Sequence, residues 1–298
     1  MSLTSFLNQK DVRKKFREQF PHPPVRRKLK PVVPPLTNHP QLIGTAFDYL
    51  LRFYIKRLNP KAITSPWVAE NVPGTLRDKI ELAKDMHVID KWKSTPLIDP
   101  KAIRYYTNLC LKIEQLLARA VKVYDSYLKD GKIDKPLLKS VILLAQIDSI
   151  YRSGEDEYEL GSIDQRDLND LEALIKLVDP KLFKSRKYCV LNPSFGPASR
   201  LVGGADADLI IDDMIVEIKT TKELHVKRAD WNQLIGYYIL TTVGGIEGVG
   251  PKYTINRIGI YFSRFGELIT VKMNIVNRKR LKSFIEWFVE RAGDSKII

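Results

Sequence analysis

Hydrophobic residues recur every three or four positions along much of residues 41–152, which is the period of amphipathic helices that bury one face. The clearest stripe comprises Ile103, Tyr106, Cys110, Ile113, Leu117, Ala120 and Tyr124. Residues 137–150 are apolar on nearly every side and predict a central helix. The pattern therefore predicts a helical domain or cap over residues 41–153.

Short β-rich runs dominate the second half of the chain. Residues 166–178 predict a helix that stops at Asp179 and Pro180, and the acidic, glycine-containing residues 154–163 before it predict a surface loop. Strands are predicted at 188–191, 207–211, 214–220, 257–262 and 268–273, and helices at 228–241 and 280–291. This order predicts an α/β domain over residues 164–298.

The first forty residues combine basic charge with two proline clusters. Nine basic residues minus two acidic ones leave seven of the fourteen excess positive charges of the chain in this segment. Prolines within 21–24 and 31–35 interrupt helices and favour an extended connector. We therefore expect a basic arm over residues 1–40, with the folded body beginning near Gln41. The arm is either a solvated tail or a phosphate-binding segment.

Composition narrows the partners and cofactors. An excess of 49 basic over 35 acidic residues favours nucleic acid or an anionic membrane surface as partner. Two cysteines are too few for a disulfide framework, a cysteine-rich zinc site or a four-cysteine iron–sulfur cluster. Four scattered histidines show no metal-ligand spacing, so a bound metal is expected to be a hard ion, Mg²⁺ or Mn²⁺. Because no apolar run could span a bilayer and no signal-peptide core is present, we expect a cytoplasmic protein.

Two β-prone runs flank Asp212 and Asp213, which predicts a hairpin with these aspartates as its turn. In that register Asp208 lies opposite Glu217, with their Cβ atoms roughly 4.5–5.5 Å apart. Alternation by two places Lys219 on the same face and apolar side chains on the other. One face is thus predicted to be acidic and to carry a lysine.

Like charges opposed across two strands repel, so these two carboxylates favour a cation between them. A divalent metal held by Asp208 and Glu217 would polarise a phosphodiester, while Lys219 would orient or deprotonate the attacking water. The pattern therefore indicates hydrolytic phosphodiester chemistry. The alternative is an edge hairpin whose solvated charges prevent aggregation.

An aspartate in one strand, a Glu-X-Lys in the next and a helix with Gln-X3-Tyr together resemble the PD-(D/E)XK nuclease superfamily. These residues are Asp208, Glu217, Lys219, Gln233 and Tyr237. The last element resembles the RecB-like branch, and the α-β-β-β-α-β order is similar to the core of the superfamily. The resemblance implies a restriction-endonuclease-like mixed sheet flanked by helices, metal ligands at Asp208 and Glu217, a catalytic lysine at Lys219 and magnesium-dependent cleavage of DNA.

The predicted helix 228–241 carries further candidates. Gln233 and Tyr237 share one of its faces and are expected to position substrate, although a surface amide and a core aromatic would have the same spacing. The turn into the helix is basic and would meet phosphate at the helix N-terminus, unless it is only a solvated loop. The residues concerned are Lys222, Lys227 and Arg228.

Three other acids are secondary candidates. The resemblance implies one more acid on the helix before the first core strand, for which Asp170 and Glu172 are both candidates. Asp206 falls opposite Lys219 in the hairpin register and is expected to orient that lysine.

We therefore predict a magnesium-dependent deoxyribonuclease that acts on DNA and does not associate with a membrane. One alternative is a binding module that kept the fold and lost catalysis. A weaker alternative is a membrane-surface scaffold attached through residues 10–30. The sequence does not choose between endonuclease and exonuclease, or among duplex, single-stranded and branched substrates, and it leaves open a homo-oligomer.

Overall fold

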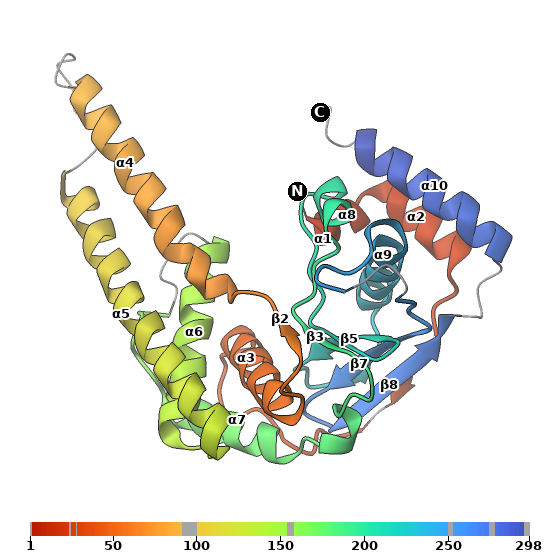
Figure 1. Cartoon of the computed structure of the whole chain (residues 1–298), viewed down its shortest axis with the longest axis horizontal. Coiled ribbons are helices and arrows are strands. Elements are labelled where there is room, and N and C mark those ends of the chain that lie inside the picture. Colours follow the sequence, from red (N-terminus) through yellow and green to blue (C-terminus); the bar gives the residue numbers. More distant parts are fainter. Residues whose placement is uncertain are drawn as a thin grey trace. The chain divides into compact units, whose positions relative to one another are not determined.

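The computed structural model divides the chain into two compact units (Figure 1). The α/β unit comprises Met1–Pro34, Leu58–Ser65 and Leu177–Ile298, and the helical unit comprises Pro35–Arg57 and Pro66–Lys176. The structure describes residues 2–23, 25–27, 29–90, 100–153, 158–249, 253–273 and 278–294. Glu155, Asp156 and Glu157 of the predicted boundary loop, and Pro24 and Lys28 of the predicted arm, lie outside the described residues.

A mixed six-stranded sheet forms the centre of the α/β unit. Its spatial order is β2 (Ile63–Thr64), β3 (Cys189–Leu191), β4 (Leu209–Ile211), β5 (Met214–Lys219), β7 (Arg257–Phe262) and β8 (Glu267–Lys272). Two pairs, β2–β3 and β5–β7, are parallel, and the other three are antiparallel. The predicted α/β class is confirmed, and β4 and β5 are internal strands of the sheet.

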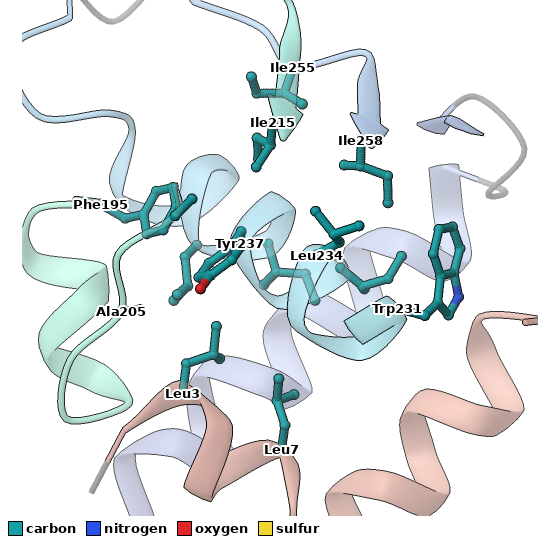
Figure 2. Close-up of a cluster of buried hydrophobic side chains, with 14 of the residues drawn as sticks. Leu3, Leu7, Phe195, Ala205, Ile215, Trp231, Leu234, Tyr237, Ile255 and Ile258 are labelled. Atoms are coloured by element: carbon teal, nitrogen blue, oxygen red, sulfur yellow. The ribbon is translucent and has the colours of Figure 1, made fainter. Parts of the chain in front are cut away.

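Helix α9 (Arg228–Gly244) lies over β5 and β7 (Figure 1). Its inner side chains, Trp231, Leu234 and Tyr237, belong to the buried hydrophobic cluster that also contains Ile215 and Ile258 of the sheet (Figure 2). The short helix α8 (Pro197–Leu201) also contacts α9. Helix α9 is therefore apolar on most of its sides. Burial of this helix fixes the height of its polar residues above the sheet.

The N-terminal residues belong to the same core. Helices α1 (Leu3–Leu7) and α2 (Lys10–Gln19), together with the residue that follows α2, bury six apolar side chains: Leu3, Phe6, Leu7, Val12, Phe16 and Phe20. Phe16 and Phe20 pack edge-to-face on Phe284 of α10 (Arg278–Asp294), with ring centroids 5.1 and 4.9 Å apart. Gly236 lets α1 approach α9, because a Cβ atom there would lie 3.1 Å from the methyl carbons of Leu3.

The prediction that the folded body begins near Gln41 is therefore wrong. Helix α2 is amphipathic, so a high net charge did not indicate an unfolded arm. Its basic residues are exposed, whereas its apolar residues are buried. The basic residues are Arg13, Lys14, Lys15 and Arg17. The prolines do end the helix, but they do not lead into an unpaired connector. Strand β1 (Arg26–Arg27) pairs with β6 (Leu224–His225).

Within its described residues, the helical unit contains five long helices: α3 (Pro40–Leu58), α4 (Val72–Asp90), α5 (Pro100–Asp130), α6 (Lys135–Ser153) and α7 (Gln165–Lys176). The predicted stripe lies along α5, where Cys110, Ile113 and Ala120 are buried. The predicted central helix corresponds to α6, which has eleven buried positions. Both helical predictions are confirmed.

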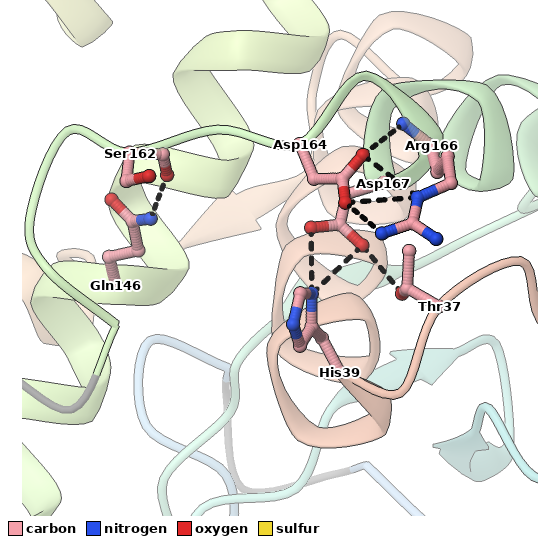
Figure 3. Close-up of polar contacts among 7 residues, drawn as sticks. All are labelled: Thr37, His39, Gln146, Ser162, Asp164, Arg166 and Asp167. Carbon is pink, nitrogen blue, oxygen red and sulfur yellow. Dashed lines mark hydrogen bonds and ion pairs between the residues drawn. The ribbon is translucent and has the colours of Figure 1, made fainter.

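Polar side chains tie α7 into the helical unit. The buried Asp167 accepts hydrogen bonds from Thr37 Oγ1, at 2.6 Å, and from the His39 ring, whose Nδ1 lies 3.0 Å from Oδ2 (Figure 3). Gln146 of α6 binds the segment before α7 through the Ser162 carbonyl oxygen. The predicted boundary at residue 164 thus differs from the observed one, which follows Lys176.

Candidate functional site

The register of the β4–β5 hairpin is the one predicted. Leu209 pairs with Val216, Ile210 with Ile215 and Ile211 with Met214, so Asp212 and Asp213 are the two turn residues. Continuing this register places Asp208 across from Glu217. The Oδ2 atom of Asp208 accepts a hydrogen bond from the Ile218 backbone N–H at 2.6 Å, which holds the carboxylate against β5.

Glu217 and Lys219 form an ion pair beneath α9. Lys219 Nζ lies 2.8 Å from Glu217 Oε1, and the Glu217 side chain is only 6% exposed. The same ammonium lies 3.5 Å from Asp230 Oδ1 and donates to Gln233 Oε1 at 3.5 Å. The alternative of an edge hairpin with solvated charges is wrong, because both strands are internal and Glu217 is buried.

The charge of Lys219 is stabilised by its neighbours. Desolvation by burial disfavours the ammonium, but Glu217 and Asp230, and more weakly Asp208, outweigh it and raise the pKa of Lys219 above its usual value. The lysine therefore carries a proton at neutral pH. As a charged group it can donate hydrogen bonds and neutralise an anion.

Helix α9 contributes three polar residues on one face. Asp230, Gln233 and Tyr237 are spaced by three and four residues, so they project together toward the end of β5. Gln233 Nε2 donates to the Tyr237 hydroxyl at 2.8 Å, and its Oε1 atom accepts from Lys219. Gln233 thus links the lysine to the tyrosine.

Tyr237 serves both the core and the polar cluster. Its ring lies 5.6 Å from that of Phe195 within the buried cluster of Figure 2. Burial, followed by the negative charges of Glu217 and Asp208, raises the pKa of its hydroxyl well above the usual value. Both carboxylates thus act on Lys219 and on Tyr237, which indicates that the four groups share one environment.

Asp230 was absent from the sequence prediction. It occupies the first turn of α9, where its Oδ2 atom accepts a hydrogen bond from the Lys227 backbone N–H at 3.3 Å. The helical spacing that associated Gln233 with Tyr237 also includes Asp230 one turn earlier. That spacing is the signal that could have found it.

The predicted basic residues have different environments. Lys222 and Lys227 are exposed, as a phosphate contact would require. Arg228 is half-buried and its Nη1 atom donates to the Phe20 carbonyl oxygen at 2.8 Å, where desolvation and the charge of Arg17 lower its pKa. Arg228 therefore connects α9 to the end of α2, in addition to the phosphate-binding role predicted for it.

Of the three secondary acids, Asp206 belongs to the α/β unit, and Asp170 and Glu172 belong to the helical unit. Asp206 is exposed, its backbone pairs with that of Ser194, and its negative charge contributes to the raised pKa of Tyr237. Among the described residues, Glu217 and Asp230 form ion pairs with Lys219. Asp170 and Glu172 lie on α7 of the helical unit. Asp170 is buried, whereas Glu172 pairs with Lys176 one turn later on the same helix at 2.5 Å.

The donor set suits a hard cation held by few protein ligands. Asp208 and Glu217 supply carboxylate oxygens, which Mg²⁺ and Mn²⁺ prefer. No group of three or more His, Cys, Asp or Glu side chains with metal-binding geometry occurs within the described part of the chain. A magnesium ion commonly keeps several waters and binds one or two carboxylates together with substrate phosphates, so two protein ligands fit that ion.

Comparisons with protein-family models, with curated proteins and with solved structures found no match to this chain. Among the described residues, none of the helices has both the length and the apolarity needed to cross a membrane.

Proposed function

We propose that the chain is a metal-dependent nuclease of the PD-(D/E)XK type that hydrolyses phosphodiester bonds in DNA. The observation that carries the proposal is the position of Asp208, Glu217 and Lys219 at one end of an internal hairpin, beneath Gln233 and Tyr237. Burying a carboxylate on an internal strand opposes folding, because the charge loses its hydration. A buried carboxylate at this position therefore suggests a functional role.

In this proposal Asp208 and Glu217 hold Mg²⁺ or Mn²⁺, which would polarise the phosphodiester and lower the pKa of a water. Lys219 contributes a positive charge to the pentacovalent transition state and orients the attacking water by hydrogen bonding. This role uses the charged form of the lysine, which pairs with two carboxylates in the structure. Glu217 and Asp230 hold the ammonium in place before substrate arrives.

Gln233 and Tyr237 position the lysine and the substrate. The Gln233 amide spans Lys219 and the Tyr237 hydroxyl, so it restrains both. Tyr237 keeps its proton at neutral pH and can donate a hydrogen bond to a phosphate oxygen. The exposed Lys222 and Lys227 would meet the DNA backbone near the start of α9.

The second candidate is a nucleic-acid-binding module that has the same fold but no catalytic activity. One contact, the ion pair between Lys219 and Glu217, favours it. The Lys219–Glu217 ion pair satisfies both charges without a metal, as a purely structural pair would. In that case the basic surface alone would hold nucleic acid.

Incubation with linear, circular and single-stranded DNA, in magnesium, manganese or chelator, separates the two candidates. Wild-type protein should cleave at least one substrate with metal and none with chelator. Glu217→Gln should lower the rate at least about a hundredfold, because one metal ligand is lost. Glu223→Gln, an equal change at an exposed loop residue, should cleave normally. Cleavage by Glu217→Gln at the wild-type rate would refute the assignment.

A further inference from the structure

A basic cavity lies in the α/β unit at the turn end of the β4–β5 hairpin. These strands carry Glu217 and Lys219 at their other end. The cavity has a volume of about 860 Å³ and is walled by residues 181–188, the hairpin turn, residues 253–257 and strand β8. None of the residues proposed for cleavage lines it.

The cavity is lined by more positive than negative charge. Its basic side chains are Lys181, Lys184, Arg186, Lys187 and Arg257. Its two carboxylates already have partners within the protein. Asp213 accepts from Arg257 Nε at 3.0 Å and Nη2 at 2.5 Å, and Asp212 accepts from backbone amides. The remaining lysines and Arg186 leave the wall positive.

Asp212 fixes the basic loop to the hairpin. Its carboxylate accepts hydrogen bonds from the backbone N–H groups of Arg186, Lys187 and Tyr188, at 3.0, 2.7 and 3.2 Å. Its own backbone has a φ of 49°, and its N–H donates to the Tyr188 carbonyl oxygen. The side chains of residues 186–188 therefore project from a backbone that is ordered before a ligand binds, which lowers the entropic penalty of binding.

An aromatic pair stands beside these cations. Tyr188 is 46% exposed, and its ring packs edge-to-face on Tyr253 with centroids 5.0 Å apart and an interplanar angle of 88°. An exposed aromatic ring held by a second ring is a platform on which a nucleobase can stack. Phosphate-binding cations beside such a platform are typical of single-strand recognition.

We propose that this cavity binds single-stranded nucleic acid, with phosphates at Arg186 and Lys187 and a base stacked on Tyr188. The choice of nucleic acid as the polyanion rests on the proposed nuclease function. The cavity would hold a strand away from the cleavage site and so favour substrates with single-stranded segments.

The test measures binding in chelator, so that it does not require cleavage. Fluorescence anisotropy with a labelled oligothymidylate should show roughly tenfold weaker binding for Arg186→Glu/Lys187→Glu and about tenfold for Tyr188→Ala. Tyr188→Phe keeps the ring and should bind as the wild type does. The matched charge control is Lys122→Glu/Lys129→Glu, at two exposed lysines of α5.

Each outcome decides the proposal. Equal losses in the 186/187 pair and the α5 pair would show a general charge effect and overturn it, as would equal binding by Tyr188→Ala and Tyr188→Phe. Competition by thymidine monophosphate or inorganic phosphate at the oligonucleotide concentration would assign a small-anion site instead. If the oligonucleotide binds as expected but no DNA is cleaved by wild-type protein, the nuclease function fails while this site stands.

Discussion

The Nζ atom of Lys219 lies 2.8 Å from Oε1 of Glu217, and both side chains are largely withdrawn from solvent. Removing the ammonium leaves a buried carboxylate without its nearest counter-charge. Lys219→Met should therefore lower the free energy of unfolding by about 1–4 kcal/mol, less than for a fully buried pair because Lys219 is 24% exposed. The double variant Glu217→Gln/Lys219→Met should recover part of this loss. Urea unfolding of the wild type, Lys219→Met, Glu217→Gln and the double variant measures it, and a double variant no more stable than Lys219→Met would show that the two charges are not coupled.

Metal binding should distinguish the two aspartates before the hairpin. Asp208→Asn should remove both the metal-binding heat and cleavage, because this carboxylate lies across from Glu217. Asp206→Asn should retain metal affinity, since Asp206 is exposed and lies two residues before the aspartate that faces Glu217. A calorimetric titration with Mg²⁺ compares them. Retention of the ion by Asp208→Asn together with its loss from Asp206→Asn would reverse the assignment.

The hydroxyl of Tyr237 should matter more for cleavage than for folding. Tyr237→Phe keeps the ring contact with Phe195 and removes the hydrogen bond from Gln233, so stability should change by about 1 kcal/mol. We expect the cleavage rate to fall about tenfold or more, from the loss of one donor in the transition state. Tyr238→Phe, the equivalent change at the next residue, is the control. Equal rates for the two variants would leave Tyr237 as a core aromatic only.

The basic helix α2 should contribute to DNA affinity only while it stays folded. Arg13→Gln/Lys14→Gln alters two exposed residues of α2 and should leave the melting temperature unchanged. If both residues contact phosphates, the slope of binding affinity against salt concentration should fall by up to about two phosphate contacts. Phe16→Ala should destabilise the protein by roughly 3–5 kcal/mol, because its ring packs on Phe20 and Phe284. Thermal unfolding and salt titrations separate the effects. A Phe16→Ala protein as stable as wild type would show that α2 is not part of the core.

Acid should weaken the ion pair between Asp213 of the hairpin turn and Arg257 of β7. Although burial opposes it, hydrogen bonds from Arg257 and Asn256 lower the pKa of Asp213 below its ordinary value of 3.8. A carboxyl group whose pKa is lower in the folded than in the unfolded protein stabilises the fold at pH values above its unfolded-state pKa. That contribution is lost as the pH falls through the folded-state pKa. At pH 7, Asp213→Asn should lower the free energy of unfolding by less than about 1 kcal/mol, since the ion pair with Arg257 is partly exposed. Near pH 2 the substitution should have no effect. Urea unfolding of the wild type and Asp213→Asn at a series of pH values checks this. When both proteins also carry Arg257→Met, most of the difference in stability between them should disappear.

Local rules were sufficient for the hairpin. A two-residue turn and a period of two fix which residues oppose one another, so the sequence alone placed Asp208 opposite Glu217 and Lys219 on the same face. Helical periodicity likewise predicted α5 and α6. These predictions depend on neighbours a few residues apart, whose geometry the backbone dictates.

Long-range packing decided the rest. Helix α2 becomes core because Phe284, over 260 residues later, covers Phe16, and nothing near Phe16 in the chain announces that partner. The two-residue strand β2 exists only because Ile63 meets Val190. Asp230 joins Lys219 because burial of α9 against β5 and β7 sets how deep its polar face lies. The sequence determined which residues share a face, and the tertiary structure decided which faces meet, because hydrophobic burial is non-directional and its partners are chosen by the whole fold.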